Sequence, residues 1–218
     1  MSRASAPAAP VDQGRLAAAA DAVAALHAIE GRGDNLVTTF LAGRDFVAFE
    51  HYPEDDRIDA GTGAQVYFHA HHPGDPGEAG HLHCFLNPEG KGDGRPIHHL
   101  AAIGLDATGR PVRLFTVNHW VVEDDFLPAA ALIDLLPRFR FGTDAPEDRF
   151  VTAMFGLFGA EIAGLIAARD RAIARFAQAH PDADALADRR LEVTSKLPVD
   201  LPALLRDLRE SLPDPLCV

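Results

Sequence analysis

Short runs in which apolar and polar residues alternate occupy the middle of the chain, and longer helical patterns lie on either side of them. The alternating runs cover residues 65–71, 81–86, 98–105 and 112–122. Segments rich in Gly and Pro separate the first three runs, and residues 106–111 (DATGRP) form a hairpin signal between the last two. Residues 46–51 (FVAFEH), followed by Pro53, predict one further strand. The pattern therefore predicts an antiparallel meander of four to five strands.

Helical patterns come before and after these strands. Asp12 is a good N-cap for an Ala-rich helix that reaches Glu30, where Gly31 follows, and residues 36–41 predict a short second helix. After the strands, residues 127–136, 145–179, 183–193 and 201–211 predict helices. We therefore expect an α+β fold in which residues 1–218 form one domain. Its parts are a disordered start at 1–10, a β-rich core at 46–122 and a helical region at 127–211.

Residues 150–168 are apolar except for Glu161 and approach the length of a membrane span. The stretch continues without a break into an amphipathic pattern that reaches Phe176, which is typical of a buried helix in a soluble protein. Glu161 should then be paired, hydrogen-bonded or directed into a site, because an isolated buried carboxylate is costly.

Charge and cysteine content narrow the function classes. The chain has 20 Lys and Arg residues against 32 Asp and Glu residues, a formal net charge of −12. This balance disfavours nucleic acid and membrane as partners, because both attract basic surfaces. Two cysteines do not make a disulfide framework, and residues 1–10 lack the apolar core of an export signal. We expect a cytoplasmic protein.

Histidine is the residue type that points to a site. The chain has 11 histidines, and most of them lie between His51 and His119. Residues two apart on a strand share a face, so Tyr67, His69 and His71 should lie together, as should His81 and His83.

If the intervening loop closes symmetrically, His71 lies opposite His81 and His69 lies opposite His83. Paired residues on neighbouring strands have Cβ atoms about 4.5–5.5 Å apart. Neutral imidazoles at such distances are ligands for Zn, Fe, Cu or Ni. The sequence therefore predicts a mononuclear metal site made by these four histidines, although a single His-x-His pattern is more often a solvent-facing strand.

The second predicted hairpin adds further candidates. Pairing of Leu105 with Val112 would put His98 opposite His119 and His99 opposite Asn118, so we include His98 among the metal ligands. Tyr67 and His119 are the candidate catalytic side chains. Three carboxylates within reach in sequence leave open whether one of them is a ligand: Glu50, Glu78 and Glu89.

The chain shows two resemblances at these positions. His81-x-His83 followed by Glu89 resembles the first metal-binding motif of cupins, with a longer spacing to the Glu and no second motif. The strings HYPEDDRID (51–59), YFHAHH (67–72), GHLHCF (80–85) and RLFTVNHWV (113–121) resemble an uncharacterised bacterial domain family, over at least residues 46–125. Leu82 stands where that family usually has an aromatic residue. The resemblance implies that the histidine face matters and implies no reaction.

We expect a transition-metal ion as cofactor, with Fe or Zn foremost, and a small-molecule substrate or a metal as partner. An open coordination position would suit a non-heme iron oxygenase or a zinc hydrolase. A closed site would favour a metal carrier, and His119 could instead be an axial haem ligand. An interaction domain with a solvent-exposed histidine face is a third alternative, and a homo-oligomer is left open.

Overall fold

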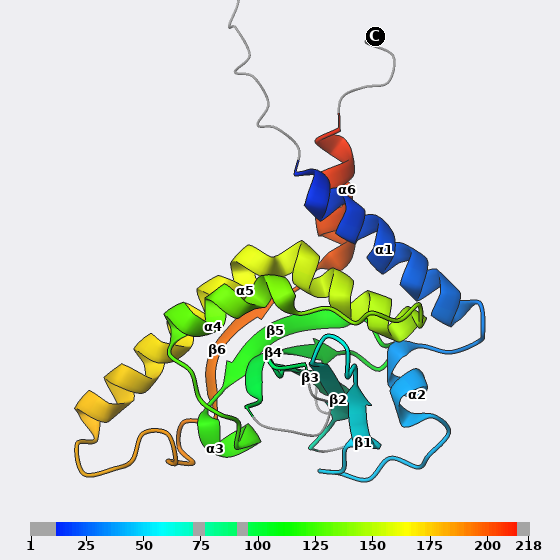
Figure 1. Ribbon diagram of the computed structural model, residues 1–218. Helices are drawn as coiled ribbons and strands as arrows, with labels where there is room; N and C mark the ends of the chain where they lie inside the picture. The colour runs from blue at the N-terminus through cyan, green and yellow to red at the C-terminus, as the bar shows by residue number, and fades with distance from the viewer. Residues whose placement is uncertain (1–11, 72–76, 91–95, 213–218) are drawn as a thin grey trace, which may run out of the picture.

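The computed structural model of the protein describes residues 12–71, 77–90 and 96–212, and its centre is one antiparallel sheet (Figure 1). Six strands pair in chain order. They are β1 (Tyr52–Ile58), β2 (Ala64–His69), β3 (Gly80–Leu86), β4 (His98–Leu105), β5 (Pro111–Val117) and β6 (Val193–Pro198). The predicted α+β class and antiparallel meander are confirmed, with one strand more than expected. The disorder predicted for 1–10 lies outside the described residues.

The helices lie mainly on one face of this sheet; the short helix at residues 119–122 packs on the other face, against Phe115 and Val117. They are α1 (Gln13–Glu30), α2 (Leu36–Leu41), α3 (His119–Val122), α4 (Ala129–Leu135), the 3₁₀ helix η1 (Leu136–Arg138), α5 (Pro146–Ala179) and α6 (Leu201–Glu210). In Figure 1 the long helix α5 crosses the face of the sheet, and α1 and α6 lie on its far side. The Asp12 side chain accepts hydrogen bonds from the first turn of α1, as expected of an N-cap.

The two faces of β3 have different surroundings, and this difference positions the site. Leu82, Cys84 and Leu86 belong to the main apolar core, together with the buried residues of α5. Residues His81 and His83 alternate with them and so point to the other face of the sheet. The histidine face is therefore the one that α5 does not cover.

Helix α5 has the length and apolar character of a membrane span, but 56% of its most apolar 18-residue stretch is buried inside the fold. The Glu161 carboxylate on this helix receives a hydrogen bond from Arg15 of α1 at 2.8 Å. The prediction that Glu161 is paired is confirmed, and the pair joins α1 to α5.

The strand predicted at 46–51 is wrong, because this segment is a loop and β1 begins at Tyr52. Pro53 does not stop the strand: β1 is at the edge of the sheet, where a residue without an N–H group is tolerated. The loop is held by the buried Tyr52 hydroxyl, which accepts from the Val47 N–H at 2.7 Å and donates to the Asp45 carbonyl at 2.9 Å.

Two predictions after residue 117 are also wrong. The strand predicted at 112–122 ends at Val117, because the Asn118 side chain accepts a hydrogen bond from the His119 N–H and caps α3. The helix predicted at 183–193 is absent: residues 183–192 form turns and irregular structure, and β6 begins at Val193 inside the region predicted to be helical. The polar side chain of Thr194 on β6 is buried against Thr116 of β5 at 2.8 Å, so this strand lacks the apolar alternation that marks the others.

Candidate metal centre

The register between β2 and β3 differs from the predicted one by two residues. His69 pairs with His81, and Tyr67 pairs with His83. The strand β2 ends at His69, so the loop takes in residues that symmetric closure had placed on the strand. Because the displacement is even, every side chain keeps its face, and the predicted histidine face survives the error.

Three of the predicted ligands come together on this face. One ring nitrogen from each of His69, His71 and His81 lies within 4.8 Å of the others, which is close enough to hold one metal ion. His71 lies beyond the end of β2, yet its ring centroid is 5.0 Å from that of His69 and 5.4 Å from that of His81. We call these three residues the histidine triad.

The Nδ1 atom of His69 is a buried polar atom of the triad without a protein partner among the described residues. Whichever tautomer the ring adopts, a buried nitrogen without a partner costs free energy. Coordination of a metal ion would satisfy this atom, so the residues present fit such an ion.

His81, the third member of the triad, is oriented by the carboxylate of Glu78. The His81 Nδ1 atom is 2.9 Å from a carboxylate oxygen of Glu78, and the same oxygen accepts a hydrogen bond from Arg113 at 2.9 Å. A carboxylate on one ring nitrogen fixes the tautomer and directs the other nitrogen towards a metal. Glu78 therefore serves as a support for a ligand, and the donor group among the described residues includes neither Glu50 nor Glu89.

Gly104 makes room for this support. It lies on β4 between His81 of β3 and Arg113 of β5, and the Glu78 carboxylate lies above it. A Cβ atom at this position would be 2.4 Å from a Glu78 oxygen and 2.7 Å from the Arg113 Cγ atom. A side chain here would therefore displace the pair that holds His81.

We expect Gly104→Ala to lower metal affinity by about tenfold, because the loss of a group that supports a metal ligand typically costs 10- to 100-fold. The measurement is a competition titration against a chromophoric chelator. In a Glu78→Ala background the same substitution should have much less effect, since its target is already gone. Equal losses in both backgrounds would contradict this account.

His83 lies next to the triad but has a different partner. Its ring centroid is 4.8 Å from that of His81, and its Nδ1 atom is 3.1 Å from the Nε2 atom of His99. Phe115 lies against both His81 and His83, with ring centroids 5.2 and 6.3 Å away. His83 and His99 thus form a buried imidazole pair between the triad and the apolar part of this face.

The structure does not bring His98 or His119 into the cluster. His98 pairs with Leu86, so it points to the core face, where its Nδ1 atom contacts the Asp125 carbonyl. His119 lies in α3, and its Nδ1 atom is 3.3 Å from a carboxylate oxygen of Asp124. The predicted pairing of these two histidines across one hairpin is wrong.

A β-bulge explains why His99, and not His98, lies on the histidine face. Cys84 pairs with Ala101, but Phe85 pairs with His99, which leaves Leu100 as the extra residue on β4. One extra residue reverses the side-chain phase of the strand beyond it. His99 therefore joins the histidine face, and no local signal in the sequence marks the bulge.

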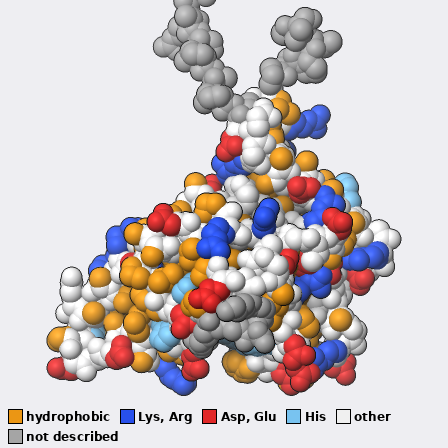
Figure 2. All heavy atoms as spheres, viewed as in Figure 1, with side chains coloured by type: hydrophobic (Ala, Val, Ile, Leu, Met, Phe, Trp, Pro, Cys, Tyr) orange, Lys and Arg blue, Asp and Glu red, His pale blue; other side chains and the backbone are white. Residues whose placement is uncertain are grey.

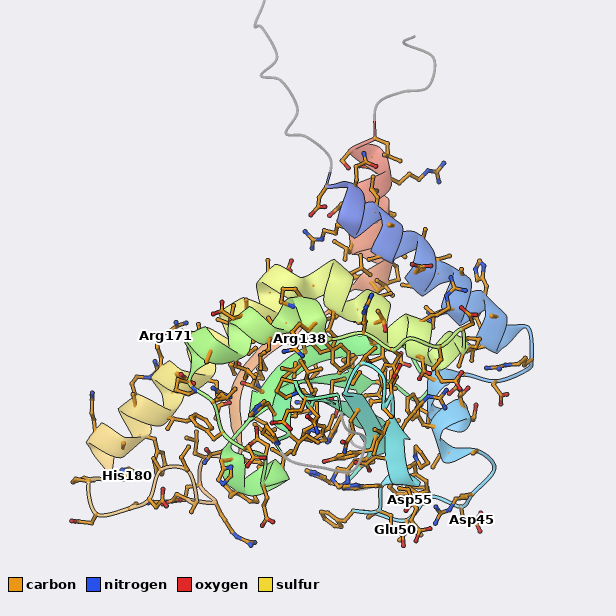
Figure 3. All side chains as sticks on the ribbon, in the orientation of Figure 1. Asp45, Glu50, Asp55, Arg138, Arg171 and His180 are labelled. Carbon is orange, nitrogen blue, oxygen red and sulfur yellow. The ribbon has the colours of Figure 1, made fainter. Side chains whose placement is uncertain are left out.

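Tyr67 lies at the edge of the cluster, in contact with His51, which was not among the predicted site residues. The ring of His51 stacks on that of Tyr67, with centroids 3.6 Å apart and planes at 9°. The His51 Nδ1 atom is 3.0 Å from an Asp56 oxygen, which orients the imidazole over the phenol. Figure 3 labels Asp45, Glu50 and Asp55, which mark the end of the molecule where the loop before β1 carries His51.

Burial and the neighbouring histidines lower the pKa values of His69 and His83. Burial, followed by the nearby histidines His81 and His71, lowers the pKa of His69 to about 4. Burial also lowers the pKa of His83 well below its ordinary value, again with His81 as the next cause. Burial opposes ionisation of Glu78, but the hydrogen bonds with His81 and Arg113 outweigh it and lower the pKa of this carboxyl. Neutral imidazoles beside an ionised carboxylate are the forms that bind a metal ion.

A pocket of about 80 Å³ opens beside the triad. His71 and His81 line it on one side, and Phe115, Val117 and Val121 line it on another. In Figure 2 histidine side chains reach the surface of the molecule below α5, near acidic side chains. Because His81 is buried and His71 is half-buried beside the pocket, the cluster is buried at its base and open towards a small cavity.

Comparison with known proteins gives a family and no activity. Residues 16–199 match the model of a family described as a domain of unknown function, DUF6969. The predicted resemblance to an uncharacterised family is confirmed, and it covers more of the chain than residues 46–125. Neither the curated proteins nor the solved structures contain a match.

Proposed function

The chain belongs to this family of unknown function, and we propose from its own residues that it binds one transition-metal ion through His69, His71 and His81. The proposal rests on the buried Nδ1 atom of His69, which lacks a partner in the described structure, and on the closeness of one ring nitrogen from each of the three histidines. Three imidazoles are a common protein ligand set for catalytic zinc and suit iron or copper equally.

The open side of the triad supports a catalytic use. Three protein ligands leave at least one coordination position for water or substrate, whereas structural sites are closed by a fourth. The pocket next to His71 and His81 is small, so its occupant should be a small molecule, and a haem would not fit there. A metal bound here would supply Lewis-acid or redox chemistry. We place an iron- or zinc-dependent enzyme ahead of a metal carrier on these grounds.

Each residue around the triad has a role in this proposal. Glu78, fixed by Arg113, orients His81, and the neutral His83 and His99 pair adds no positive charge next to a bound cation. Phe115 excludes water from that side of the imidazoles.

The surroundings of the protein are part of the same proposal. Cys84 is a free thiol buried in the core, which suits a reducing compartment such as the cytoplasm. The net charge of −12 argues against nucleic acid or an anionic membrane as a partner.

The test is the metal content of protein purified without an affinity tag. The chain is stripped with a chelator, reconstituted anaerobically with Fe(II), Zn(II) or Cu(II) in turn, and desalted. We expect close to one ion per chain for at least one metal. A His69→Ala, His81→Ala double variant is the matched control, because it removes two donors and leaves the apolar core face of β2 and β3 unchanged. Metal content no higher in the native chain than in this variant would refute the proposal.

A further inference from the structure

Phe49 has a conformation and an exposure that the fold alone does not explain. Its φ angle is 70°, in the left-handed region that bulky side chains avoid, and the residue is 62% exposed. A strained backbone and an aromatic ring in water both cost free energy, and such costs concentrate at functional sites. We therefore asked which contacts this conformation of Phe49 makes possible.

The ring of Phe49 lies against two members of the histidine triad. It stacks on His71 with centroids 5.4 Å apart and planes at 18°, and its edge packs on His69 with centroids 6.1 Å apart. The Phe49 N–H donates to the Ala70 carbonyl at 2.9 Å, which ties the loop to the backbone between these two histidines. The left-handed conformation of Phe49 places its ring against His71 and His69.

Unlike the other two members of the triad, His71 lies outside the paired strands. His69 and His81 lie on paired strands, where the sheet fixes their backbones, whereas His71 follows the end of β2. His81 is also held by Glu78, and the ring of Phe49 gives His71 a stacking partner in the same way. The pocket is lined by His71 and His81, so the ring and the pocket lie against different pairs of the triad.

We propose that Phe49 is a positioning residue of the metal site: its ring, stacked on His71 and packed on His69, holds the His71 imidazole in coordinating orientation. The inference rests on the proposed metal site. It explains why the chain keeps a strained, exposed aromatic residue in a loop that the Tyr52 hydroxyl fixes at Val47.

The experiment separates positioning from stability with Phe49→Gly, Phe49→Tyr and Val47→Ala. Glycine adopts the left-handed conformation without strain, so the metal-free Phe49→Gly chain should melt at the native temperature or above it. Its metal affinity should fall about tenfold, the size of effect that loss of a ligand's support produces. Its Co(II) complex should show a shifted visible absorption spectrum, because His71 is no longer held. Phe49→Tyr keeps the ring and should restore both affinity and spectrum.

Val47→Ala is the matched control, since Val47 is exposed in the same loop and has no ring in contact with the triad. It should bind metal as the native chain does. Native affinity and an unchanged cobalt spectrum in Phe49→Gly would overturn the inference, as would equal losses in Phe49→Gly and Val47→Ala. Absence of metal binding in the native chain would instead refute the proposed function itself.

Discussion

Replacement of His69, His71 or His81 by alanine should each lower metal affinity by more than about 100-fold. Loss of groups that merely orient a ligand costs about 10- to 100-fold, and loss of a ligand itself should exceed that range. The three donor nitrogens lie within 4.8 Å of one another, so no other side chain in the described cluster takes the place of a missing one without moving. Chelator competition on each metal-free variant measures the change directly.

Two further histidines serve as controls for this prediction. His180→Ala should bind metal normally, since His180 lies at the far end of α5 (Figure 3). His98→Gln should lower the free energy of unfolding and leave affinity nearly unchanged, because His98 is buried on the core face. Loss of metal in His98→Gln with normal binding in His69→Ala would mean that the site lies elsewhere.

Acid should destabilise the metal-free protein, with His99 as a main cause. Burial lowers the pKa of His99 to about 4, against the attraction of Asp124, while the unfolded chain has a pKa near 6.5. Below about pH 6.5 the unfolded state therefore binds a proton that the folded state does not, and the free energy of unfolding falls as the pH falls. Between about pH 7 and about pH 5 this one residue should cost about 2 kcal/mol.

Urea denaturation of the chelator-treated protein across this pH range measures the effect. His99→Asn keeps a polar group beside His83 but does not titrate, so its stability should depend less steeply on pH. His69 and His83, whose pKa values are also lowered by burial, contribute to the remaining slope. Identical slopes for the native chain and His99→Asn would show that His99 is not the buried neutral group described above.

How far the sequence predicts this site depends on which signals are local. Alternation along a strand is a local signal, so it predicts that His69 and His81 share a face. The prediction of the face holds although the predicted register is wrong by two residues, because an even displacement leaves each side chain on its face. The position of His71 after the strand end depends on the loop, which alternation does not describe. His71 was nevertheless among the predicted ligands, because the predicted alternation continued two residues past the end of β2.

The errors come from interactions between distant segments. The bulge at Leu100 arises where β3 and β4 meet, and it exchanges His98 for His99 on the histidine face. Arg113 reaches Glu78 only because β4 between them carries Gly104. Asn118 was the one local signal available for the end of β5, since it is a good N-cap residue placed before the run that forms α3.

The closeness of the triad in sequence has a consequence for how metal and folding are coupled. His69 and His81 are only twelve positions apart, so the entropy lost on closing the chain between them is small. An unfolded chain can bring the same imidazoles to an ion, and metal bound to unfolded molecules offsets part of the stabilisation that binding gives the native state. Metal loading should therefore raise the melting temperature less than the native affinity implies, and the ion can be captured while the β2–β3 hairpin is still forming.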